Sequence, residues 1–255
     1  GTRVLDGRGG YLIPGLWDMG SLVLQGHRTT VPGALALMLA HGVVGTRDLN
    51  TDMPVDSVAQ LAREIDAGIR AGPRRVWTGA SLQQSIPAGS PNFVRVDSLR
   101  DVLARVARMA DAGAYHVRLV QGFREADVPA VVAAARARGL PVTIAPVFGW
   151  DSAVALGVAG IEHFADLKRT TAVAPLRARY RLLYRDEMRR PSRAVVQPFL
   201  DSLDAHPDTA YRRAVLATVA RAGVPVTTNM ATMFWAQALL AERYPARARW
   251  VRADA

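Results

Sequence analysis

The feature that most constrains the fold of this chain is a repeated order of helix, glycine and short strand. An amphipathic segment ends in glycine and a β-branched run follows within a few positions, as in Arg138-Gly139-Leu140-Pro141-Val142-Thr143-Ile144. Glycine just after a helix supplies the left-handed backbone that ends it, and the apolar run can be a fully buried strand. The same order recurs around Gly42, Gly113, Gly157 and Gly223. Strands that alternate with helices in this way predict parallel β-α-β units.

The number of these units favours a (β/α)8 TIM-type barrel. No Gly-rich dinucleotide fingerprint is present, which argues against a Rossmann sheet. A helix is expected over 99–109, with Asp97 or Ser98 as its cap. The expected strands lie at 12–19, 43–49, 74–80, 116–121, 141–147, 160–164 and 224–229.

The eighth strand is not recognisable, so we expect an incomplete α/β barrel. Residues 1–11 would lead into it, and residues 12–255 would supply strands one to seven. An Arg-rich stretch at 165–208 interrupts the alternation of strands and helices between strands six and seven. It is expected to form either solvated connecting helices or a lid, because βα connections emerge on the catalytic face of a barrel.

Composition excludes several functional classes. The net charge is +10, yet among 32 basic residues only Lys168 is a lysine, and the arginines are scattered among many alanines. We therefore expect no nucleic-acid binding, since no DNA-binding motif such as a helix-turn-helix accompanies the charge.

The absence of Cys excludes a thiol nucleophile and thiolate metal ligands. No apolar run is long enough for a membrane-spanning helix. No secretory signal is visible, and a cytoplasmic location is favoured.

Five segments, in order, resemble one known family, the amidohydrolase superfamily, and within it the imidazolonepropionase-like and Xaa-Pro dipeptidase-like branch. The resemblance implies a barrel entered from a small β-sandwich, of which residues 1–11 would be the remnant. It also implies a metal-dependent hydrolase of C–N bonds in cyclic amides or dipeptide-like substrates. The matching segments are Gly10–Met19, His41–Asp48, Gly72–Gly79, Gly113–Arg118 and Gly160–His163.

The metal ligands that the resemblance implies are mostly replaced in this chain. Only the strand-six histidine is retained, as His163. The other ligand positions hold Gly20 and Leu22 after strand one, Arg118 in place of a carboxylated lysine on strand four, and Ala145 on strand five. The strand-eight aspartate would lie beyond Ala255. Because a catalytic metal site normally uses three protein ligands, metal-dependent activity is expected to be lost or impaired. No cofactor is predicted, except Zn²⁺ or another divalent metal if activity remains.

Polar side chains at the strand ends are candidates for a small-molecule site in the barrel pocket. They are Asp18, Asp48, Ser81, Arg118, Gln121, His163 and Asn229. The guanidinium of Arg118 can hold a ligand carboxylate bidentately, with Asp48 and Asn229 as further ligand-binding residues. Alternatively, Arg118 pairs with Asp48 or Glu162 and fills the vacant site.

The remaining histidines are expected to be structural. His27 lies in a polar turn, His41 at a helix C-terminus and His206 in a loop, while His116 is expected to face the helix layer. Three functions stay open: a pseudoenzyme or binding scaffold, an active hydrolase with a rearranged mononuclear site around His163, and a metal-free enzyme that uses Arg118. A homo-oligomer is a possible assembly.

Overall fold

Parallel strands form the centre of the protein. The structure is a computed structural model, and it describes residues 6–24, 31–84, 94–120, 122–185 and 193–229. One sheet has the order β1-β2-β3 and the other the order β5-β4-β6-β7-β8-β9, with every paired neighbour parallel. The strands are β1 (Leu16–Ser21), β2 (Val43–Asp48), β3 (Arg74–Val76), β4 (Leu82–Gln83), β5 (Val94–Arg95), β6 (Val117–Leu119), β7 (Val142–Ile144), β8 (Gly160–Glu162) and β9 (Val226–Thr227).

These positions confirm the seven predicted strands, whereas the short strands β4 and β5 were not predicted. The first strand starts at Leu16 rather than at residue 12, and the third ends at Val76 rather than at residue 80. The next strand after β3 is β4, which pairs with β5 and with β6 in the second sheet. The lead-in has no strand in its described part, residues 6–11.

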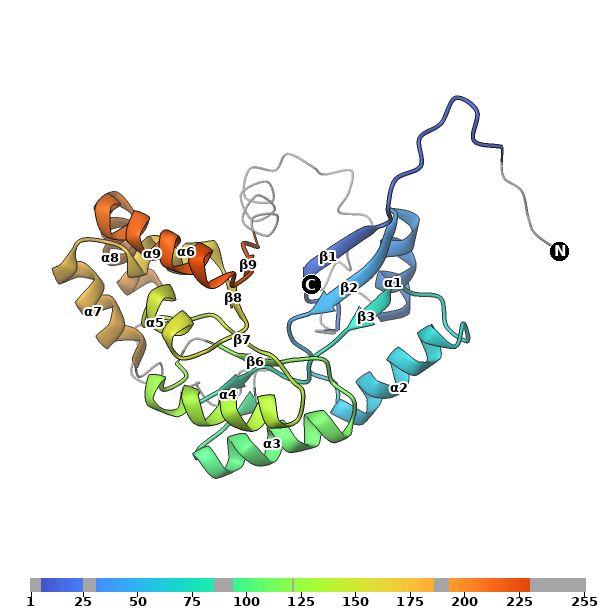
Figure 1. Ribbon diagram of the computed structural model, residues 1–255, viewed down its shortest axis with the longest axis horizontal. Helices are drawn as coiled ribbons and strands as arrows, with labels where there is room; N and C mark the ends of the chain where they lie inside the picture. Colours follow the sequence, from blue (N-terminus) through green and yellow to red (C-terminus); the bar gives the residue numbers. More distant parts are fainter. Residues whose placement is uncertain (1–5, 25–30, 85–93, 121, 186–192, 230–255) are drawn as a thin grey trace.

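Helices follow the strands and cover them on the outside (Figure 1). They are α1 (Val31–Ala40), α2 (Val55–Asp66), α3 (Leu99–Asp111), α4 (Val128–Ala137), α5 (Trp150–Ala155) and α9 (Thr209–Ala222), with a short 3-10 turn at Glu125–Asp127. The Ser98 hydroxyl caps α3 by accepting a hydrogen bond from the Asp101 N–H at 3.2 Å. Gly139 and Gly223 end α4 and α9 with φ of 72° and 65°, values that favour glycine.

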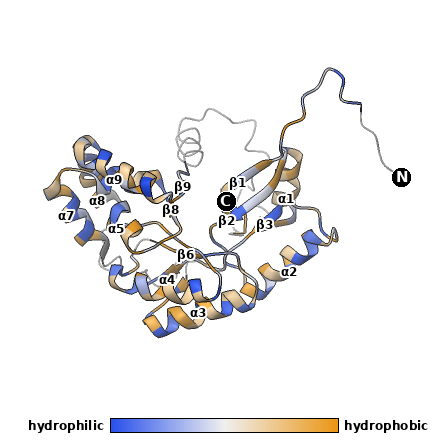
Figure 2. Ribbon diagram, in the orientation of Figure 1, coloured by the Kyte–Doolittle hydropathy of each residue, from blue (hydrophilic) through white to orange (hydrophobic). Residues whose placement is uncertain are grey.

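One continuous core joins the strands to these helices. Val102 and Val106 of α3 and Val131 of α4 are buried against strand residues such as Val117 and Leu119. Figure 2 shows hydrophobic and hydrophilic residues alternating along α2 and α3, as in helices with one buried face. None of the helices in the described ranges is long and apolar enough to cross a membrane.

The Arg-rich stretch forms a helical insert between β8 and β9. Its helices are α6 (Phe164–Thr170), α7 (Ala174–Arg185) and α8 (Arg193–Ala205). Tyr180, Leu200 and Leu203 form a second, smaller core there, which Val147 of the barrel completes. In Figure 1 the insert lies beside α9, at the opposite side of the molecule from β1. It therefore packs as a small unit on one flank of the barrel.

Candidate functional site

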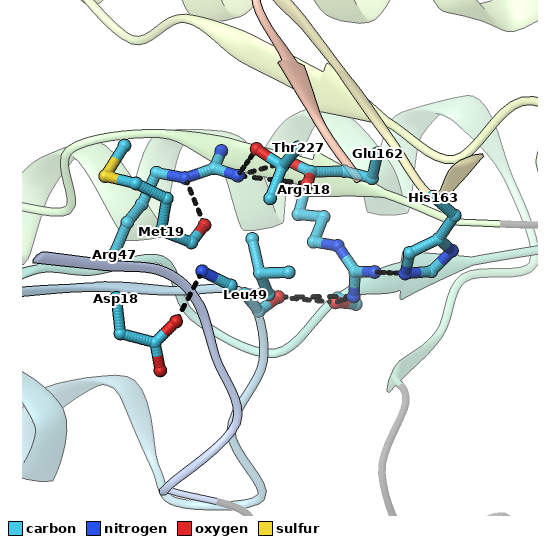
Figure 3. Close-up of polar contacts among 10 residues, drawn as sticks. Asp18, Met19, Arg47, Leu49, Arg118, Glu162, His163 and Thr227 are labelled. Atoms are coloured by element: carbon cyan, nitrogen blue, oxygen red, sulfur yellow. Dashed lines mark hydrogen bonds and ion pairs between the residues drawn. The ribbon is translucent and has the colours of Figure 1, made fainter. Parts of the chain in front are cut away.

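Arg118 lies at the centre of a polar cluster inside the barrel. It projects from β6 with 4% of its surface exposed. Its Nη1 donates to the Ser81 hydroxyl at 2.8 Å and to the Leu49 carbonyl at 3.3 Å, and its Nη2 lies 3.3 Å from His163 Nε2 (Figure 3). Because a guanidinium can only donate, His163 accepts at Nε2 and carries its ring proton on Nδ1. Arg118 thus fixes the imidazole of His163.

The groups that contact Arg118 directly are all neutral. They are a hydroxyl, a carbonyl and an imidazole, and no described carboxylate lies within 4.0 Å of the guanidinium. Burial lowers the pKa of Arg118 to about 10, partly opposed by the charge of Glu162. The side chain therefore stays charged at neutral pH. A buried charge without a paired counter-charge is costly.

Glu162 is engaged by a different arginine. Arg47 Nη2 lies 2.8 Å from Glu162 Oε1 and donates to the Thr227 hydroxyl at 2.7 Å, while its Nε donates to the Met19 carbonyl at 2.9 Å (Figure 3). These contacts tie β1, β2, β8 and β9 together across the interior. The sequence did not single out Arg47, because Arg47 and Glu162 lie 115 positions apart in the chain and no local pattern links them.

Asp48 is also paired with another arginine, Arg75 of β3. Both side chains are almost completely buried and form an ion pair. Burial raises the pKa of Asp48 to about 6, against the opposing effects of Arg75 and Ser21. The alternative in which Arg118 pairs with Asp48 or Glu162 is therefore not what the structure shows. That Asp48 binds a ligand stays a prediction, and its carboxylate is already held by Arg75.

Asn229 lies against the position of the first implied metal ligand. A Cβ atom on Gly20 would be 2.5 Å from Asn229 Oδ1, so the amide fills the space where a side chain at position 20 would begin. Asp18 accepts a hydrogen bond from the Gly20 N–H at 2.9 Å. The end of β9 and the end of β1 therefore meet at Gly20. A role of Asn229 in ligand binding stays a prediction.

The other two replaced ligand positions differ in exposure. Leu22 is 40% exposed, whereas Ala145 is buried, and its N–H donates to the Leu119 carbonyl at 3.1 Å. Gln121, a further candidate, lies outside the described residues.

His163 has an unusual backbone and a second polar neighbour. Its φ is 68°, a left-handed value rare for residues other than glycine, and it directly precedes α6. Its Nδ1 is 3.7 Å from the buried Asp166 carboxylate. The ring is thus held between a cation on one side and a carboxylate on the other, with 30% of the side chain exposed.

The placement of His116 corrects one prediction. Instead of facing the helix layer, it lines an interior cavity with Arg47 and Glu162. The reason is alternation, because residues 116 and 118 of an extended segment share a side. Burial, with added effects of Arg47 and Arg118, lowers the pKa of His116 to about 3, so it is neutral.

Two other histidines are exposed and bond to their own helices. Nδ1 of His41 lies 2.8 Å from the Leu37 carbonyl, and Nδ1 of His206 lies 2.8 Å from the Ser202 carbonyl. His41 directly follows α1, as predicted. His27 lies outside the described residues.

The side chains described here do not fit a divalent metal. Within the described ranges, no three His, Asp or Glu side chains come close enough together to hold one. His163 Nε2, one of the two ring nitrogens that could bind a metal, faces the Arg118 guanidinium instead. A fixed positive charge beside a ligand atom repels a cation. The cluster is better suited to an anion.

No family model matches the sequence, and no curated protein matches it either. Solved structures do match. They include an amidohydrolase (18% identity, TM-score 0.55, 89% of this chain and 68% of that one). A putative prolidase from Bifidobacterium longum matches at 17% identity and TM-score 0.55 (89% and 64%), and a Xaa-Pro dipeptidase with bound methionine at 19% and 0.52 (84% and 64%).

These similarities confirm that the chain has an amidohydrolase-like α/β barrel fold. The chain spans 64% to 68% of the length of these solved structures. At such identities the likeness concerns the fold alone.

Proposed function

We propose that this chain is a non-catalytic binding barrel, derived from a C–N hydrolase scaffold, that takes a small carboxylate at Arg118. One observation carries the proposal, namely that the buried guanidinium contacts only neutral groups. A ligand carboxylate would supply the missing counter-charge. Metal-dependent hydrolysis would have been lost with the replaced ligand positions.

The donors of Arg118 suit this role. Nη1 is occupied by Ser81 and Leu49, whereas Nε is buried and has no hydrogen-bond partner in the described structure. Nη2 contacts His163 and has a second N–H. Guanidinium groups bind carboxylates through two parallel N–H donors, which adds both strength and orientation. The guanidinium of Arg118 would then be oriented by its contacts with Ser81, Leu49 and His163.

A second candidate is an active hydrolase with a rearranged mononuclear metal site around His163. The observation in its favour is the 3.7 Å distance between His163 Nδ1 and Asp166 Oδ2, which brings two metal-binding residue types together. The Arg118 contact at Nε2 opposes it.

Thermal shift measurements test the carboxylate site. Acetate, propionate and succinate are compared with their amides, using the wild type, Arg118→Met, Arg118→Lys and the surface control Arg108→Met. We expect the acids to raise Tm by about 2 °C or more at concentrations well above Kd, and the amides to have no effect. Arg118→Met should abolish the response, and Arg118→Lys should weaken it because the planar fork is lost. Equal responses to acids and amides, or an unchanged Arg118→Met response, would refute the proposal.

Metal analysis separates the two candidates. After dialysis against Zn²⁺ and then buffer, the wild type should retain less than stoichiometric metal. Stoichiometric Zn²⁺ that is lost in His163→Ala but kept in the exposed control His206→Ala would establish the second candidate instead.

A further inference from the structure

A second cavity lies where the insert meets the barrel. It has a volume of about 570 Å³, within the range of small-molecule pockets. Loops that follow β6 and β7 provide one side, with the buried rings of Phe123 and Phe148, and α7 provides the other, with Arg181. Because connections after barrel strands emerge at the C-terminal end, this cavity opens on the functional face. Arg118 is not among its lining residues.

Arg181 differs from the other arginines around it. Arg124 pairs with Asp127 at 2.7 Å, Arg177 pairs with Asp208 at 3.3 Å, and Arg179 stacks on the Phe199 ring at 4.7 Å. Arg181 has no carboxylate within 4.0 Å in the described part of the chain, and its buried Nε has no hydrogen-bond partner there. Arg181 therefore makes no direct ion pair within the described residues.

The backbone at Gly149 makes room for this guanidinium. Gly149 has φ of 124°, which residues other than glycine rarely adopt, and a Cβ there would lie 2.7 Å from Asp151 Oδ1 and 3.0 Å from Arg181 Nη2. The loop after β7 thus accommodates the charged end of Arg181 beside the two phenylalanine rings.

We propose that this cavity is a second binding site, independent of Arg118, for a monocarboxylate that carries an aromatic group. Arg181 would bind the carboxylate through its N–H donors, and Phe123 and Phe148 would contact the ring. Glu125 on the cavity wall disfavours a second negative charge on the ligand. The inference goes beyond the small-carboxylate site, since it requires apolar contacts that the Arg118 cluster does not offer.

Titration with 3-phenylpropionate tests the proposal, with 3-phenylpropionamide and propionate as comparison ligands. The variant Arg181→Met should weaken 3-phenylpropionate binding about tenfold or more, as expected for a lost charge-assisted pair. The matched control Arg179→Met, on the same helix, should bind within about twofold of the wild type, and so should Arg118→Met. In Arg118→Met, which lacks the other proposed carboxylate site, the amide and propionate should both bind more weakly than 3-phenylpropionate.

A second variant tests the site even if Arg181→Met does not fold. Ala126 is an exposed residue of the cavity wall, so Ala126→Trp should fill the space without removing any core contact and abolish binding. Unchanged binding in folded Ala126→Trp or Arg181→Met, or equal binding of acid and amide, overturns this site. Loss of 3-phenylpropionate binding in Arg118→Met instead also overturns it, while leaving the Arg118 site standing.

Discussion

Two buried arginines of the barrel, Arg75 on β3 and Arg118 on β6, have opposite surroundings. Both are nearly inaccessible, at 3% and 4% exposure. Arg75 meets the carboxylate of Asp48, whereas Arg118 meets a hydroxyl, a carbonyl and the imidazole of His163. The first charge has a carboxylate in direct contact, and the second has none among the described residues. Arg75 therefore stabilises the barrel through its ion pair, whereas the charge of Arg118 is available to a ligand.

The largest expected effect separates the two arginines by stability. Arg75→Met leaves the Asp48 carboxylate buried and unpaired, so it should lower the free energy of unfolding by about 3 kcal/mol or more. Arg118→Met removes an uncompensated charge, so in the absence of ligand it should leave that free energy unchanged or raise it by up to about 2 kcal/mol. Urea unfolding measures both.

Arg108→Met is the control for these two variants. Arg108 pairs with Asp56 at the surface, where ion pairs contribute less than about 1 kcal/mol. If Arg118→Met lost as much stability as Arg75→Met, the guanidinium of Arg118 would be structural and the contrast would fail.

The second effect concerns the pH dependence of stability. The pKa of Asp48 in the folded protein is about 6, above its ordinary value of 3.8, so the folded state binds this proton more tightly than the unfolded chain. The contribution of Asp48 to stability is therefore full below about pH 4 and is lost as pH rises through 6. Relative to Asp48→Asn, the wild type should lose about 1 to 3 kcal/mol between pH 4 and 6. A constant difference across that range would show that burial does not dominate at Asp48.

The sequence was sufficient to predict seven of the nine strands in the described residues, but not the short strands β4 and β5. Local signals carried that information, since Gly139 and Gly223 end helices and the Ser98 hydroxyl caps one. The choice of a barrel over an open doubly wound sheet rested on the number of units and a missing motif, and the solved structures confirm it.

The partners inside the barrel could not be predicted in the same way. Alternation along a strand shows which residues share a side, but the assignment of sides to core or helix layer was wrong for His116. Which arginine meets which carboxylate depends on how strands are staggered across the interior. That is why Glu162 pairs with Arg47, and Asp48 with Arg75, although both carboxylates had been considered as partners of Arg118.

The smallest expected effect lies where β1 meets the end of β9. Gly20→Ala places a Cβ against Asn229 Oδ1, and it should cost about 0.5 to 1 kcal/mol because the amide can move. In an Asn229→Ala background the same substitution should be neutral or slightly stabilising. The double-mutant cycle measures this coupling by urea unfolding. Independent, additive effects would show that the two residues do not touch.

Stability measured with and without a carboxylate tests most directly whether a ligand carboxylate pairs with the buried charge of Arg118. Urea unfolding is compared for wild type and Arg118→Met, first in chloride buffer and then in 50 mM propionate at equal ionic strength. We expect Arg118→Met to be as stable as the wild type or more stable in chloride, and propionate to raise the stability of the wild type alone. A wild type that propionate leaves unchanged, or an equal gain in both proteins, would contradict this expectation.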